Sequence, residues 1–431
     1  MMRTAVSCLL LAIALSACGD GSTSSGATST GSATSTGSAS STSDGSSSGA
    51  GTGNTSGGSS NGSGGSSGSS GGSSGSSGGS SGSGGSAGSG SNSAGFVSFA
   101  DSLPPAGSKG TDAIPTGAGL ADASNPDHVI GNGTPASCTS AAVVAAVAAG
   151  GVITFSCGSA PVTIQMTATA KIFNNAASTT VLDGGGRVTL SGMGQRRILY
   201  MNTCDQTLVW TTSHCQNQEY PQLTVQNLTF AGGDASSETI PEGGAIYASG
   251  GRLKVVNSRF FGNVCASTGP DTAGGAIYST NQYQGLPVYV VHSTFGGNSA
   301  SSNVCSNGGA LGSIGVSWTI INSVLTYNEA VGNGGNPATS GTPGGGSGGA
   351  IYNDGNTMTL TIDGSQLSYN RVNAFGSAII FVSDNYTGSI AITDSTITGN
   401  LGGSWYPTYP QISAFPSTPI TVTHSVIANA D

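Results

Sequence analysis

Asn257–Asn263 reads NSRFFGN, and the same pattern returns five more times along the chain. The copies are HSTFGGN at 292–298, NSVLTYN at 322–328, GSQLSYN at 364–370, DSTITGN at 394–400 and a degenerate HSVIAN at 424–429. Their serines lie 35, 30, 42, 30 and 30 residues apart. A repeat of this size indicates stacked supersecondary units. Such an array presents long repetitive faces, which suit binding or an open cleft better than a deep pocket.

Adding the repeat spacing sorts the apolar residues into columns. The residue five before each serine is always large and apolar, as in Leu223, Leu253, Val288, Trp318, Leu360, Ile390 and Ile420. The same holds three before and two after the serine, as in Val225, Val255, Val290, Ile320, Ile362, Ile392 and Val422, and in Phe230, Phe260, Phe295, Leu325, Leu367, Ile397 and Ile427. The first two columns differ by two residues, which is the period of a strand. The pattern therefore predicts an all-β fold with a stacked core.

Polar residues form two further columns. One holds asparagines, which we expect to hydrogen-bond along the stack rather than to form a polar binding strip: Asn263, Asn298, Asn328, Asn370 and Asn400. The other holds His292 and His424 beside Asn257, Asn322 and Asp394, and this composition favours turn residues over metal ligands.

A second motif, GGA[IL], begins the next stretch of the repeats, at Gly243, Gly274, Gly308 and Gly348. Together with FxxN at Phe260–Asn263 and Phe295–Asn298, it resembles the repeats of the chlamydial polymorphic outer-membrane proteins. The resemblance covers about residues 223–430. It implies a right-handed parallel β-helix at the cell surface with a role in adhesion.

The region before the repeats fits the same fold. DGGGRVTLSG at 183–192 resembles the opening coils of pectin-lyase-like proteins, a likeness of fold and not of catalytic motif. SAAVVAAVAAGGVITF reads as a short helix followed by a strand. We therefore predict a single-stranded right-handed parallel β-helix with an N-terminal cap helix. Residues 96–222 would hold the cap and first coils, and residues 223–431 the repeat coils.

The N-terminus predicts export. Residues 1–17 have a short basic start, an apolar run and a small-residue cleavage site, which together indicate a signal peptide. Cys18 follows directly and resembles a bacterial lipobox cysteine, so lipidation at Cys18 and an outer-membrane, surface-exposed location are implied. Ordinary cleavage beside an incidental cysteine is the alternative. Residues 18–95 are almost entirely Gly, Ser and Thr, which predicts a flexible tether spanning about 45–50 Å.

Charge and cysteine usage narrow the function. The formal net charge is −9, which argues against nucleic acid as a partner. Apart from Cys8 and Cys18, six cysteines remain, and an even number in an exported chain suggests disulfides. Several pairings are open. Our hypothesis joins neighbours on a cap, a loop and two adjacent coils, as Cys138–Cys157, Cys204–Cys215 and Cys265–Cys305.

Catalytic groups are scarce on the face that the columns define. Among the outward positions four and six before each serine, only Arg252 and Lys254 are ionisable, and no carboxylate stands beside them. A solvated edge is the ordinary reading, and Tyr289 in the same column makes the three a candidate binding set. Polysaccharide lyases need a base with cations, and glycoside hydrolases need paired carboxylates.

The best acidic group lies in the turns before GGA. Asp234, Glu238 and Glu242 precede one copy and Asp271 the next, so stacking could gather them. A calcium site and a hydrolase pair are the functional alternatives to solvated loop charge, which we favour. No other cofactor is expected. The tyrosines of GGAIY either form an aromatic strip for sugars or pack inside.

These observations favour a non-catalytic surface protein. We expect a lipid-anchored β-helix that contacts the membrane through Cys18 and binds a polysaccharide or cell-surface ligand. The competing hypothesis is a polysaccharide lyase or glycoside hydrolase of the pectin-lyase-like type. Carboxylates or cations that meet in one exposed groove would favour the enzyme.

Overall fold

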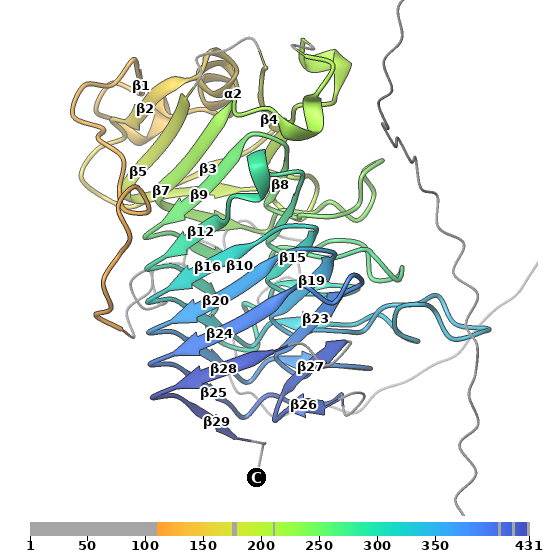
Figure 1. The fold of residues 1–431 in the computed structure, drawn as a ribbon. Helices are drawn as coiled ribbons and strands as arrows, with labels where there is room; N and C mark the ends of the chain where they lie inside the picture. The colour runs from red at the N-terminus through yellow and green to blue at the C-terminus, as the bar shows by residue number, and fades with distance from the viewer. Residues whose placement is uncertain (1–109, 175–178, 210–211, 404–406, 416–418, 429–431) are drawn as a thin grey trace, which may run out of the picture. The chain divides into compact units, whose positions relative to one another are not determined.

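A computed structural model describes residues 110–174, 179–209, 212–403, 407–415 and 419–428 (Figure 1). Cys18, the predicted signal peptide and the predicted tether lie outside these residues. The described part is all-β apart from one α-helix, α2 (Ser140–Ala149), and four short 3-10 helices, η1 (Pro135–Ser137), η2 (Gln206–Leu208), η3 (Cys215–Asn217) and η4 (Tyr283–Gly285). In this part of the chain no helix has the length and apolar character needed to cross a membrane.

The largest sheet has 17 strands and carries the repeat columns. Its early strands are β1 (His128–Ile130), β2 (Gly151–Phe155), β3 (Val162–Gln165), β5 (Thr179–Ser191) and β7 (Gln222–Ala231). One row of later strands is β9 (Arg252–Val256), β12 (Val288–Val291), β16 (Trp318–Ile321), β20 (Thr359–Asp363), β24 (Ser389–Thr393) and β28 (Ile420–Thr423). A parallel row is β10 (Arg259–Phe261), β13 (Thr294–Gly296), β17 (Val324–Thr326), β21 (Gln366–Ser368), β25 (Thr396–Thr398) and β29 (Val426–Ala428).

Two smaller sheets hold the remaining strands. The sheet of nine strands is built from β4 (Ala170–Ile172), β6 (Leu199–Asn202), β8 (Ile246–Ser249), β11 (Ile277–Thr280), β15 (Leu311–Ile314), β19 (Ile351–Gly355), β23 (Ile379–Ser383), β27 (Ile412–Phe415) and β26 (Pro407–Tyr409). The third sheet holds β14 (Val304–Cys305), β18 (Glu329–Ala330) and β22 (Arg371–Val372). All described strand pairs are parallel except β26–β27. This stacking is compatible with a parallel β-helix.

The strand register confirms the apolar columns. Val255 pairs with Val290, and Val290 pairs with Ile320 on the next strand. These side chains are fully buried, because each large apolar residue covers its counterpart one repeat away. The rings of Phe230, Phe260 and Phe295 stack with centroids 4.8 and 4.6 Å apart. The core therefore runs along the stack as ladders of like residues.

The serines that mark the repeat form a ladder of their own. The backbone N–H of Ser293 donates to the hydroxyl of Ser323 at 3.1 Å, and Ser323 donates in the same way to Ser365 at 3.0 Å. The residue before each serine has a left-handed backbone, with φ of 47° at Asn257, 46° at His292 and 50° at Asn322 among others. Because Asn, Asp and His tolerate this conformation better than most residues, the prediction that the histidines of this column are turn residues is confirmed.

The asparagine ladder exists, but one of its predicted members is wrong. The Nδ2 of Asn263 donates to Asn303 Oδ1, that of Asn303 to Asn328, and that of Asn328 to Asn370, each at 2.9 Å. Asn298 is not a member. The extra residues that follow it form a turn, in which Asn298 Oδ1 accepts from the backbone N–H of Ala300 at 2.9 Å. Asn303 then arrives at the stacked position instead.

Helix α2 covers one end of the stack, as expected of a cap. Thr139 accepts a hydrogen bond from the N–H of Ala142 at its start, and Gly150 ends it with φ of 75°. Val143 and Val147 are buried against the first strands. Disulfides join Cys138 to Cys157 around this helix, Cys204 to Cys215, and Cys265 to Cys305, the pairs that the sequence suggested.

Candidate functional site

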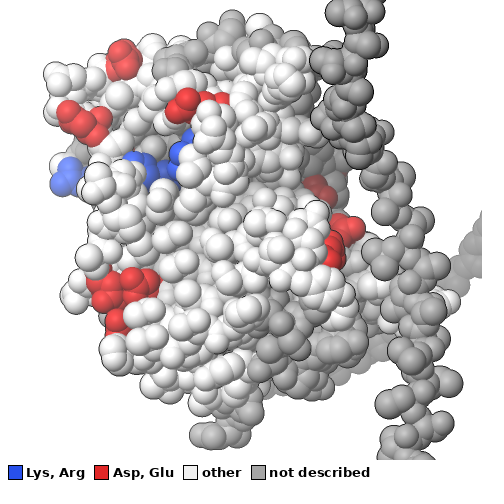
Figure 2. All heavy atoms as spheres, viewed as in Figure 1, with Lys and Arg blue, Asp and Glu red and all other residues white. Residues whose placement is uncertain are grey.

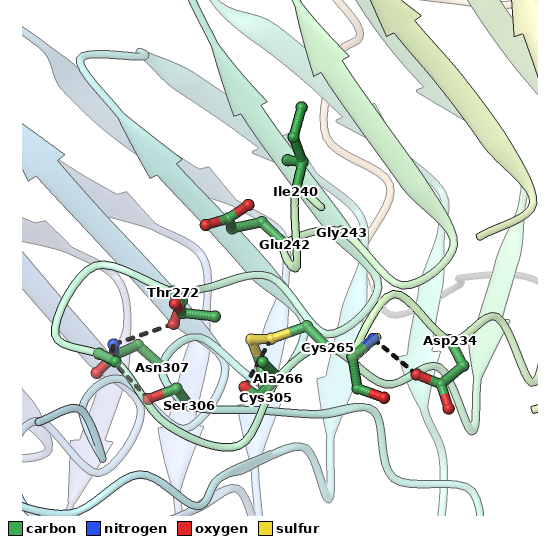
Figure 3. Close-up of a disulfide and its surroundings, with 12 residues drawn as sticks. Asp234, Ile240, Glu242, Gly243, Cys265, Ala266, Thr272, Cys305, Ser306 and Asn307 are labelled. Atoms are coloured by element: carbon green, nitrogen blue, oxygen red, sulfur yellow. Dashed lines mark hydrogen bonds between the residues drawn. A yellow bond between two sulfur atoms is a disulfide. The ribbon is translucent and has the colours of Figure 1, made fainter. Parts of the chain in front are cut away.

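The four carboxylates expected before the GGA motifs do not form one set of metal ligands, although the charge of Asp271 acts on Glu242. The carboxylate of Asp234 accepts a hydrogen bond from the backbone N–H of Ser236 at 2.8 Å. Figure 3 shows Asp234 and Glu242 at different places around the Cys265–Cys305 disulfide. Within the described ranges, the one group of acidic residues whose ligand atoms lie within 4.8 Å of one another contains none of the four.

Arg197 fixes the loop that carries two of these carboxylates. Its side chain is 3% exposed and donates to the carbonyls of Ile240, Glu242 (2.8 Å) and Gly243 (3.0 Å). Burial lowers the pKa of Arg197, and the negative charge of Glu238 acts against that effect. Burial also raises the pKa of Glu242. Arg197 therefore holds this loop in place through the loop's backbone carbonyls.

The tyrosines of the GGAIY motif line the outer face of the sheet of nine strands, away from the central core. Tyr247 of this motif stacks on Tyr200, which stands outside the motif, and on Tyr278, with ring centroids 5.5 and 5.7 Å apart. Arg197 lies over the rings of Tyr200 and Tyr247. None of these rings is more than 8% exposed, and Tyr352 is 1% exposed. Rings covered in this way cannot stack on a sugar, so their contribution is packing.

An unpredicted polar cluster joins Asp271 to Asp354. The hydroxyl of Tyr352 lies 2.9 Å from Asp354 Oδ2 and 3.3 Å from Asp271 Oδ1. The amide of Asn336 donates to Asp271 at 2.8 Å and to Asp354 at 3.2 Å. Burial raises the pKa of Asp354 to about 6. This cluster fastens the long loop that contains Asn336 to β19, and it also places two carboxylates around one hydroxyl.

The predicted binding set of Arg252, Lys254 and Tyr289 shares one cleft. Lys254 pairs in register with Thr224 on one side and with Tyr289 on the other. Arg252 lies two residues before Lys254 on the same strand, so the binding set shares the outer face of the largest sheet. Figure 2 shows Lys and Arg side chains gathered on the face where β9 and β12 lie in Figure 1. The cleft has a volume of about 360 Å³, and no carboxylate is among the described residues that line it, which include Thr116, Gly117, Gln222, Thr224 and Leu286.

The two cations of the cleft have different roles. The ammonium of Lys254 donates to the carbonyls of Gly117 at 3.1 Å and Gly119 at 2.8 Å. Burial lowers the pKa of Lys254, and the charge of Arg252 lowers it further. The Nε of Arg252 is buried without a hydrogen-bond partner in the described part of the chain. Lys254 therefore holds a wall in place, while Arg252 keeps donors to spare.

That wall is a segment from far upstream, residues 110–121. Asn322 holds its start, donating to the carbonyl of Asp112 at 2.9 Å and accepting from its N–H at 3.1 Å. Gln226 holds its end, accepting from the N–H of Ala121 at 2.8 Å and donating to its carbonyl at 3.0 Å. Ala118 between them is fully buried against the sheet. Three anchors thus fix the segment along the outer face.

One acidic group has the spacing of metal ligands. Asp112, Asp363 and Asp394 place ligand atoms within 4.8 Å of one another. One oxygen of Asp363 is buried without a hydrogen-bond partner among the described residues. The imidazole of His424 lies 3.5 Å from Asp394. Oxygen ligands of this kind suit calcium, although the sequence pointed to other carboxylates.

Comparison with known proteins gives no match for this chain, whether with protein-family models, curated proteins or solved structures. The likeness to the chlamydial repeats therefore rests on the motifs alone.

Proposed function

We propose that this chain is a surface-anchored lipoprotein whose residues 96–431 form a right-handed parallel β-helix that binds glycans or surfaces without catalysis. The observation that carries the proposal is the cleft shared by Arg252, Lys254 and Tyr289. It offers cations, hydroxyls and an aromatic ring, so it can bind a ligand, and its described lining residues lack the paired carboxylates that a glycoside hydrolase needs. The register of the parallel strands, repeated about every thirty residues, supports the β-helix.

The lipid anchor and tether complete the proposal. A lipid on Cys18 would hold the chain at the outer membrane, and residues 18–95 would carry the folded part away from the membrane surface. A binding face gains from such reach, because it can then meet a partner surface. The composition of the tether supports this role, since it has almost no apolar side chains with which to build a core.

Protease shaving of intact cells tests the location. Release of a fragment that contains residues 96–431 from intact cells is the expected result. Protection in intact cells, with cleavage in a lysed control, would place the chain in the periplasm and rule out adhesion. Labelling with a radioactive fatty acid tests the anchor, which should be lost in Cys18→Ser and kept in Cys8→Ser, a matched change within the signal peptide.

A hydrolase is the second candidate, because Asp271 and Asp354 contact the same Tyr352 hydroxyl. A raised pKa is expected of a general acid, and burial raises that of Asp354 to about 6. Release of new reducing ends from a polysaccharide by the full chain would support this candidate, provided that Asp354→Asn abolishes it and Asp234→Asn does not. Binding of a polysaccharide without its cleavage would contradict the hydrolase candidate.

A further inference from the structure

The cation cleft has no internal counter-charge. Among the residues that the structure describes, Asp394 beside His424 is the one acidic side chain at salt-bridge distance from a basic one, and neither Arg252 nor Lys254 takes part in that contact. Gln222 at the edge of the cleft donates to the exposed Glu219 at 3.3 Å, and Glu219 does not line the cleft. Two adjacent cations without a carboxylate form a positive site on a chain whose net charge is −9. Like charges held together in this way favour an anion between them.

Arg252 is the group with donors to offer. Its Nε is buried and makes no hydrogen bond to the described residues. Arg252 lines the cleft, so a ligand there can meet its guanidinium. A planar guanidinium matches a carboxylate, which it binds with two parallel hydrogen bonds. The two backbone contacts of Lys254 fix its ammonium in the wall, from where its charge adds to the field.

The rest of the cleft is suited to a sugar chain. Tyr289 and the 37% exposed Leu286 provide apolar surface, on which the C–H face of a sugar ring can lie. Gln222, Thr224 and Thr116 provide an amide and hydroxyls for sugar hydroxyl groups. The volume of about 360 Å³ lies in the range of small-ligand sites, about 300–1,000 Å³.

We propose that this cleft binds a carboxylate-bearing glycan, with Arg252 as the residue that holds the carboxylate. This inference rests on the proposed glycan-binding function and adds the chemical class of the ligand. The wall of residues 116–119 makes the site specific to the folded chain, because it comes from more than a hundred residues upstream of β9.

Binding of defined oligosaccharides to the full chain tests the proposal. The probes are a hexameric oligouronate, its methyl ester, a neutral hexasaccharide and dextran sulfate, each titrated at two salt concentrations. Arg252→Gln should raise the Kd for the oligouronate at least tenfold, and Arg252→Lys by less, because it keeps the charge and loses the fork. Arg371→Gln removes an exposed arginine elsewhere and should change the Kd less than twofold. Unfolding midpoints show whether each variant is folded.

The outcomes separate this inference from the function on which it rests. Equal Kd values for wild type and Arg252→Gln would overturn the site while leaving glycan binding in place. Binding of the methyl ester as tightly as the acid, or of dextran sulfate more tightly than the oligouronate, would overturn the carboxylate as ligand. Absence of binding to every probe and to intact cells would overturn the proposed function itself.

Discussion

The asparagine ladder allows a substitution that changes hydrogen bonds and almost nothing else. Asn328 is fully buried. Its Nδ2 donates to the carbonyl of Phe295 at 3.2 Å and to Asn370 Oδ1 at 2.9 Å, and its Oδ1 accepts from Asn303 at 2.9 Å. Asn328→Asp keeps the shape of the side chain and replaces the donor by an acceptor. The carbonyl of Phe295 and the amide oxygen of Asn370 then both face an oxygen.

The expected loss follows from these contacts. Each buried polar group left without its partner costs about 1–3 kcal/mol, so two such groups predict a loss of about 2–6 kcal/mol in the free energy of unfolding. Burial must raise the pKa of the new carboxyl above its unfolded value of about 3.9. A raised folded pKa means that the deficit is smallest below pH 4 and grows as the pH rises, by about 1.4 kcal/mol for each unit of pKa shift.

Asn298 supplies the matched control, because it occupies the same place in its motif and lies outside the ladder. Its Oδ1 accepts a backbone hydrogen bond at 2.9 Å in a partly exposed turn. An aspartate can keep that bond, so Asn298→Asp should cost less than about 0.5 kcal/mol, as for most surface changes. Urea unfolding followed by circular dichroism at pH 4 and pH 7 measures both variants. Equal losses in the two variants would show that the ladder does not stabilise the fold in this way.

Three further changes test other parts of the structure. Burial raises the folded pKa of Asp354 to about 6, so the protonated form stabilises the fold and about 2–3 kcal/mol should be lost between pH 4 and pH 6; Asp354→Asn should remove this fall from the unfolding midpoints. Replacing Cys265 and Cys305, which are 40 residues apart, by serine should cost about 2–4 kcal/mol in urea unfolding. The reduced wild type is the control, and the loss in the serine variant should be no larger than the loss on reduction. Lys254→Met should speed hydrogen–deuterium exchange in residues 110–121 and leave the exchange rates of the repeat strands unchanged. An equal change in exchange rate across the whole chain would contradict the anchoring role.

The repeat columns could be predicted because burial selects side chains at every turn of the stack. Val255, Val290 and Ile320 meet in register at the positions that the spacing indicated. The asparagine position is less predictable, because any residue that reaches the stacked site can replace the one in the motif. The turn at 298–302 takes Asn298 out of line and brings Asn303 in. Spacing identifies a column well only where no extra residues stand beside the position that stacks.

The candidate site was predictable on one side only. The columns placed Arg252, Lys254 and Tyr289 on the same outer face, and the strand register agrees. The opposite wall, residues 116–119, has no repeat and no charge pattern that could pair it with β9. The meeting of Asp271 and Asp354 at the Tyr352 hydroxyl could not be predicted either, since it depends on the outward direction of Tyr352, which the motif alone could not set.

The place of the cleft follows from a break in the repeat. At the outward position shared by Lys254, other repeats carry small residues, among them Thr224, Thr319 and Thr361, whose short side chains leave the sheet flat. Lys254 and Tyr289 are the large exceptions, and the segment that folds back over the sheet is held where they stand. A regular core fixes the sheet, so a few outward residues can change without disturbing it. The departure from the repeat is therefore the feature that separates a binding site from the rest of a uniform surface.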